Sequence, residues 1–202
     1  MFGLSGTRRR SAIVVSILVV AAAVLTTGVI AGQFRSADPT SFHDAMATGE
    51  ITRVADISAA DGFSARGVFA QTTETGQICL WDAPSEKSLQ RGGGCSPADD
   101  PLGGSAISAS LAYEGGPAIE GVHDARLIGL TSSDVADVRV LMSDGTSREM
   151  KLKKAKVDSD TFLAFGYRFK KADLRSGIGP TAIVAFDASG AELARQPTGI
   201  GG

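Results

Sequence analysis

The chain has 202 residues, of which 43% are hydrophobic and 21% are charged, and its formal net charge is −2 at pH 7. A slightly acidic balance excludes the class of basic domains that bind nucleic acids. The charge is uneven along the chain: residues 35–147 carry 7 basic and 16 acidic groups, whereas residues 148–175 carry 9 basic and 4 acidic groups.

An apolar segment dominates the N-terminal part of the sequence. Residues 11–34 contain no charged side chain, and a helix of that length reaches about 36 Å, enough to cross a hydrocarbon core of about 30 Å. Basic residues are concentrated on its N-terminal side, at Arg8, Arg9 and Arg10. By the positive-inside rule, the sequence predicts a cytoplasmic tail (1–10), a transmembrane helix (11–34) and a domain outside a single-pass membrane protein.

A cleavable signal peptide is the alternative interpretation of the same segment. Small residues suited to cleavage occur at Ala21-Ala22-Ala23 and before Gly32, and cleavage would make the protein secreted. The apolar core is longer than the 7–15 residues usual for signal peptides, which favours the anchor. Both interpretations export the domain that follows.

Residues 35–60 are predicted to form a stalk with a short helix. Asp38 suits an N-cap with Pro39 at the first helical position, and Gly49 would end the helix. The apolar residues of this segment fall on one helical face that could pack on the following domain: Phe42, Ala45 and Met46. The next piece, ITRVADIS, is ambiguous between a helical turn and a strand.

From Phe63 onward the pattern alternates with period two between frequent turn residues, which is typical of an all-β domain. We therefore expect an extracytoplasmic, antiparallel β-sandwich of about eight strands over residues 61–202, with residues 84–104 as a loop. The expected strands, eight or nine in number, are 66–71, 77–83, 106–113, 123–131, 135–142, 146–152, 162–169, 181–186 and 191–195.

Two hairpins allow a register to be predicted. A three-residue loop over 143–145 pairs Val138 with Met150, so that the apolar side chains of both strands share one face and Gly145 supplies a positive φ. For the last hairpin, a four-residue loop over 187–190 would pair Val184 with Leu193, which brings larger apolar groups together.

The two cysteines, Cys79 and Cys95, both lie on the exported side and are predicted to form a disulfide with Cα atoms about 4.4–6.8 Å apart. Zinc is excluded because two thiols need two further ligands, and the histidines are only His43 and His123. Trp81 falls on the same strand face as Cys79, so we expect it to pack in the core.

The segments GQICLWD, GGGC and ARLIGLTSSDVADVRVLMSDGTSREMKL resemble exported or membrane-anchored, β-rich actinobacterial proteins, over roughly residues 40–165. The resemblance implies a short helical stalk, a cysteine-containing strand, a glycine-rich cysteine and a hairpin. The motifs are structural, and that family carries no established activity or catalytic residues.

No motif for catalysis, cofactor binding or metal binding is found. The sequence lacks G-x-S-x-G, H-E-x-x-H and a P-loop. Ser105 is expected in a flexible loop and His123 beside a strand, while Asp158 and Asp160 lack the spacing of a calcium loop. The favoured function is an envelope protein with a binding or structural role; the alternative is an exported hydrolase with a dispersed active site.

Basic residues are the one compositional sign of a partner, which would be a protein or an anionic component of the envelope. If strands 146–156 and 162–169 pair, several lysines would cluster and could bind an anionic surface. They are Lys151, Lys153, Lys154, Lys156, Lys170 and Lys171.

The anchor can be tested by the mass and partitioning of the protein isolated from its host. A retained helix over 11–34 should keep the full-length chain in the membrane fraction through carbonate and salt washes. A mature N-terminus just after Ala31 would instead establish the signal peptide.

Overall fold

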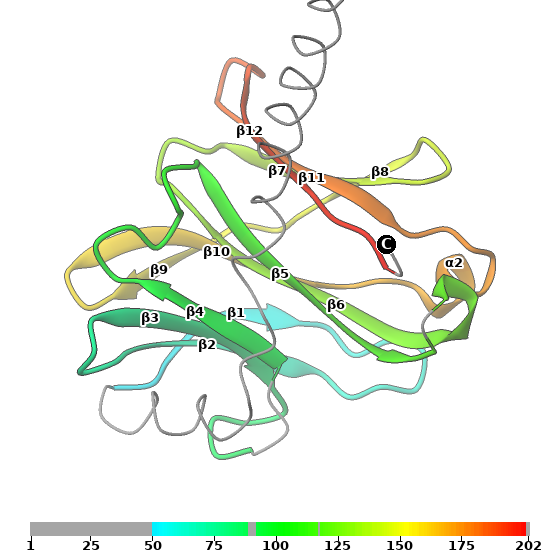
Figure 1. Cartoon of the computed structure of the whole chain (residues 1–202), viewed down its shortest axis with the longest axis horizontal. Coiled ribbons are helices and arrows are strands. Elements are labelled where there is room, and N and C mark those ends of the chain that lie inside the picture. Colours follow the sequence, from blue (N-terminus) through cyan, green and yellow to red (C-terminus); the bar gives the residue numbers. More distant parts are fainter. Residues whose placement is uncertain (1–49, 89–91, 117, 201–202) are drawn as a thin grey trace, which may run out of the picture. The chain divides into compact units, whose positions relative to one another are not determined.

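The computed structural model describes residues 50–88, 92–116 and 118–200, which are mainly β. They form twelve strands in three antiparallel four-stranded sheets (Figure 1). Sheet 1 has the order β1-β2-β3-β4, sheet 2 the order β5-β6-β10-β9, and sheet 3 the order β12-β11-β7-β8. The predicted tail, the apolar segment 11–34 and the predicted helix over 38–49 lie outside the described residues. Within the described ranges, no helix is both long and apolar enough to span a membrane.

The bounds of the elements are as follows. Sheet 1 contains β1 (Thr52–Ile57), β2 (Arg66–Thr72), β3 (Gln77–Ala83) and β4 (Gly92–Pro97). Sheet 2 contains β5 (Ile107–Gly115), β6 (Val122–Thr131), β10 (Asp160–Arg168) and β9 (Lys153–Val157). Sheet 3 contains β12 (Glu192–Pro197), β11 (Pro180–Phe186), β7 (Asp137–Met142) and β8 (Ser147–Glu149). Two short helices, η1 (Ile119–Gly121) and α2 (Lys171–Arg175), complete the described part.

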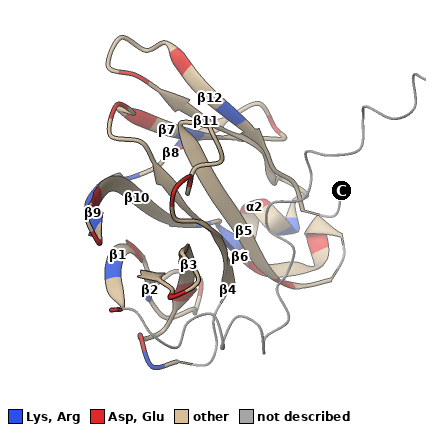
Figure 2. Cartoon of the chain, turned by 60° about the vertical axis from the view of Figure 1, so that its left-hand side comes forward, with Lys and Arg blue, Asp and Glu red and all other residues tan. Residues whose placement is uncertain are grey.

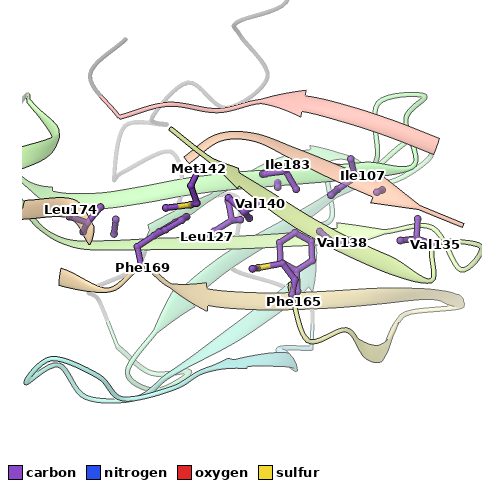
Figure 3. Close-up of a cluster of buried hydrophobic side chains, with 14 of the residues drawn as sticks. Ile107, Leu127, Val135, Val138, Val140, Met142, Phe165, Phe169, Leu174 and Ile183 are labelled. Atoms are coloured by element: carbon purple, nitrogen blue, oxygen red, sulfur yellow. The ribbon is translucent and has the colours of Figure 1, made fainter. Parts of the chain in front are cut away.

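Sheet 2 is the middle layer, because a hydrophobic cluster lies on each of its faces. Between sheets 2 and 3 the cluster includes Leu127, Val140, Phe165 and Ile183 (Figure 3). Between sheets 1 and 2 a second cluster includes Ile57, Val68, Ile128 and Ala164. The sequence predicted a two-layer sandwich of about eight strands. The described residues instead form three layers with twelve strands.

Two glycines of sheet 2, Gly129 and Gly166, allow the neighbouring residues to pack closely against the sheet. A Cβ on Gly129 would lie 2.3 Å from the ring of its cross-strand neighbour Phe165. A Cβ on Gly166 would lie 2.8 Å from side-chain atoms of Ile57 and Val68 in sheet 1. Side chains at either position would push neighbouring residues out of the core.

Two segments that the sequence did not assign to sheets are strands. Residues 52–57, placed in the stalk, form β1 and pair with β2, so the β domain extends to Thr52 at least. Residues 92–97, expected in a loop, form β4 opposite β3. Glycine has a low strand propensity, but a Cβ on Gly93 would lie 2.0 Å from the Leu80 carbonyl oxygen, so only glycine fits there.

The register of the first hairpin is confirmed and that of the last is wrong. Met150 donates its backbone N–H to the Val138 carbonyl at 2.8 Å, and Gly145 has a φ of +80°. In the last hairpin Val184 pairs with Arg195 instead of Leu193. The Asp187 side chain accepts backbone N–H groups of Ser189 and Ala191, which tightens the turn to three residues and moves the register by one position. A register irregularity between Ala185 and Phe186 moves it by one more.

The predicted disulfide between Cys79 and Cys95 is confirmed and joins β3 to β4. Its Cα atoms are 3.9 Å apart, closer than the expected range, because the two residues lie directly opposite each other on neighbouring strands. Trp81 is fully buried beside Cys79 and Phe69, as predicted for core packing.

Removal of the disulfide should destabilise the domain. The double variant Cys79→Ala/Cys95→Ala should lower the free energy of unfolding by about 3 kcal/mol, because the loop is no longer closed in the unfolded chain. Urea denaturation monitored by circular dichroism measures this difference. Reduced wild-type protein serves as the matched control, and an unchanged midpoint after complete reduction would contradict the prediction.

Candidate functional site

A network of six charged side chains lies at one end of the interface between sheets 1 and 2. It contains three arginines and three carboxylates and is therefore neutral overall. All of its members except Glu114 are buried or nearly so. They are Arg66 on β2, Asp82 on β3, Glu114 on β5, Asp124 and Arg126 on β6, and Arg168 on β10.

Arg126 is the centre of this network. Its Nε donates to Asp82 Oδ2 at 3.0 Å, which links sheet 2 to sheet 1. Its Nη1 contacts Asp124 on the same strand and Glu114 Oε1 at 3.1 Å on the neighbouring strand. Arg66 donates to the same Asp82 Oδ2, so one buried carboxylate oxygen accepts from both layers.

Asp124 holds two arginines that face each other. Arg126 and Arg168 are direct cross-strand neighbours on β6 and β10, an arrangement in which like charges repel. The Asp124 carboxylate contacts Arg126 through Oδ2 and accepts from Arg168 Nε through Oδ1, at 3.0 Å. This bridging contact offsets the repulsion between the two guanidinium groups.

Arg168 also binds the loop that connects β1 to β2. Its Nη1 donates to the backbone carbonyls of Ser58 at 3.0 Å and Ser64 at 2.9 Å. Its guanidinium lies over the Phe63 ring, 5.4 Å from the ring centroid. The network thus orders a loop of sheet 1 from a strand of sheet 2.

The pKa values of the central pair are shifted. Burial raises the pKa of the Asp82 carboxyl, and the attraction of Arg126 and Arg66 offsets only part of this rise. Burial alone would lower the pKa of Arg126, but Asp82 and Asp124 outweigh it and raise the pKa. Arg126 therefore stays protonated, and Asp82 is the member of the pair whose charged state burial penalises.

Each carboxylate of this network contacts at least one guanidinium group. The arrangement therefore supports a structural role, in which the network joins sheet 1 to sheet 2. Sequence analysis did not identify it. One usable signal was present: Asp124 and Arg126 are opposite charges two positions apart within a strand, on the face that also carries Ile128. Opposite charges on an otherwise apolar strand face indicate a buried pair.

The structure divides the predicted lysine patch into two groups. Lys153, Lys154 and Lys156 lie on β9, with Lys151 just before it, and all four are exposed. Lys170 and Lys171 follow the far end of β10. Because Lys153 pairs with Ala164, six strand positions separate this point from Lys170, a distance of roughly 20 Å.

The two lysine groups differ in their contacts. In the β9 group, Lys153 approaches Asp56 at 3.5 Å, whereas Lys151, Lys154 and Lys156 make no ion pair with any described residue. In the other group, the Lys171 ammonium lies 5.8 Å from the Phe63 ring centroid, and its backbone N–H donates to Asp61.

The remaining candidates from the sequence do not converge. His123 stacks on Phe63 with ring centroids 6.3 Å apart, and Asp158 lies in the β9–β10 turn with a φ of +52°. Ser105 is exposed before β5, and His43 lies outside the described residues. In the described ranges, no three His, Cys, Asp or Glu side chains group to hold a metal ion.

A small pocket opens where β3 and β4 approach β5 and β6. Its volume of about 10 Å³ is that of about one water molecule. Apolar side chains and three serines line it, among them Ser96, whose hydroxyl donates to the Pro101 carbonyl. It does not include the charged network.

Comparison with known protein families, with curated proteins and with solved structures finds no match for this chain. The resemblance to exported actinobacterial proteins stays a prediction.

Removal of one carboxylate from the network should be costly. Asp82→Asn removes the buried carboxylate that contacts both Arg66 and Arg126 and should lower the free energy of unfolding by about 3–5 kcal/mol. Glu114→Gln is the control, because the Glu114 side chain is 54% exposed and its pair should contribute about 0–1 kcal/mol. Equal losses in urea denaturation of the two variants would contradict the structural role of Asp82.

Proposed function

We propose that this chain is a single-pass envelope protein whose external β domain binds the anionic lipid headgroups of the membrane that anchors it. The role is one of binding, and residues 11–34 are the proposed anchor. The observation that carries the proposal is the row of exposed lysines on β9 (Figure 2).

The placement of these lysines supports contact with a flat surface. β9 is an edge strand of sheet 2, so its outer side is not covered by another strand of that sheet. Ala155 and Val157 point into the core, whereas Lys154 and Lys156 project together from the opposite face, roughly 7 Å apart. Both ammonium groups are therefore available to the same partner.

The expected energy is sufficient for a weak, salt-sensitive interaction. Each lysine close to an anionic membrane contributes about 1 kcal/mol, and the contribution falls off within a Debye length of about 10 Å at 0.1 M salt. Lys151, Lys154 and Lys156 together would contribute about 3 kcal/mol, or roughly a hundredfold in affinity. The short reach suits a domain that an anchor already holds near the membrane.

The proposal can be tested by sedimentation of the fragment 34–202, which contains all twelve described strands, with vesicles that contain phosphatidylglycerol. The fragment should bind at low salt and dissociate at physiological salt. Lys154→Gln/Lys156→Gln should weaken binding by about 2 kcal/mol, or roughly thirtyfold.

Lys170→Gln/Lys171→Gln is the matched control, because it removes the same charge from the other lysine group. It should leave binding nearly unchanged. Equal weakening by both double variants would show a net-charge effect instead of a β9 surface. Absence of binding at low salt, or equal binding to neutral vesicles, would refute the proposal.

A further inference from the structure

The outer face of sheet 1, which points away from sheet 2, carries an apolar cluster. Strand alternation places Val68 and Leu80 toward sheet 2 and the neighbouring Phe69 and Trp81 on the opposite side. We define the outer face of sheet 1 by its large apolar groups: Phe69, Cys79, Trp81, Ala83 and Cys95. The Phe69 and Trp81 rings stack, with centroids 5.9 Å apart.

These side chains are buried although sheet 1 is a terminal layer. Trp81 and Cys79 are fully buried and Phe69 is 4% exposed. Of the hydrophobic residues in the described ranges, only Ile51 and Cys95 are partly buried against them. Large aromatic groups bury about 150–250 Å² each, so a further apolar element is needed to cover them.

The N-terminal end of the described residues indicates which segment of the chain could cover this face. Ile51, next to the first described residue Glu50, packs against the Trp81 cluster. Chain connectivity therefore ties the segment before Glu50 to a residue at the border of this face. The sequence of that segment, from Asp38 to Gly49, has the amphipathic pattern predicted above, with Phe42, Ala45 and Met46 on one side.

The dimensions of the segment and the face agree. The apolar cluster extends across β2, β3 and β4, or about 10 Å at the usual strand spacing, and from Cys79 to Ala83 along β3, or about 13 Å. A helix of ten residues is about 15 Å long and about 10 Å wide. One such helix would cover the cluster.

We propose that residues 38–49 dock on the outer face of sheet 1 through Phe42, Ala45 and Met46 and complete the core around Trp81. The segment then belongs to the β domain and is not a free stalk. This inference does not depend on lipid binding by β9.

Trp81 provides a specific probe, because it is the single tryptophan of the chain. In the full-length protein in detergent micelles, Phe42→Ser/Met46→Ser should shift Trp81 emission to longer wavelength and raise acrylamide quenching several-fold. Asp44→Ser/Ala47→Ser is the matched control, with two substitutions on the opposite side of the same helix, and should leave both signals unchanged. Far-UV circular dichroism verifies that the sheets persist in each variant.

A second measurement identifies the occupant directly. A photoreactive benzoyl-phenylalanine in place of Phe42 should cross-link to peptides of β2 or β3 in the same chain, as mass spectrometry of mixed isotope-labelled chains can establish. Cross-links between two copies would overturn the proposal in favour of a dimer. Unchanged Trp81 signals in Phe42→Ser/Met46→Ser, or cross-links only to other parts of the chain, would also overturn it.

Discussion

The contact between Arg126 and Asp82 is a buried ion pair that joins sheet 2 to sheet 1. The apolar cluster between these sheets favours burial, but hydrophobic contact has no direction and tolerates sliding. A buried ion pair does restrict sliding, because a displacement that separates its two charges costs several kcal/mol of stability. We infer that the network contributes more to a unique sheet alignment than to stability, consistent with the raised pKa of Asp82, which burial causes.

The middle position of sheet 2 imposes a second constraint, since both of its faces must be filled. On β6, Leu127 packs toward sheet 3 while Ile128 packs toward sheet 1. The same requirement explains Gly129 and Gly166, which leave space for Phe165 on one side and for sheet 1 on the other. The face of sheet 2 that packs on sheet 1 is ionic at one end and apolar over the rest, and sheet 1 matches it at both parts.

Local patterns allowed part of this fold to be predicted. The hairpin around Gly145 followed from alternation, because a slip of one residue would expose Val138 or Met150. The number of layers could not be predicted from the sequence, because alternation of apolar residues along one strand does not reveal which sheet covers each of its faces. β4 was missed because its glycines fit the close approach of β3, a long-range contact. The ionic network was missed for the same reason: its members come from five strands, and the contacts Arg126–Asp82 and Arg168–Asp124 each join residues 44 positions apart.

Under the docking proposal, the connection between the proposed anchor and the β domain is shorter than the predicted stalk. β1 begins at Thr52, and under the docking proposal residues 38–49 also belong to the domain. Only residues 35–37 then separate it from the proposed anchor, a reach of about 10 Å when extended. That reach is close to one Debye length at 0.1 M salt, the range within which exposed lysines are attracted to headgroups. A short connection and a basic edge strand would therefore reinforce each other, because neither a distant patch nor a neutral one would gain from the anchor.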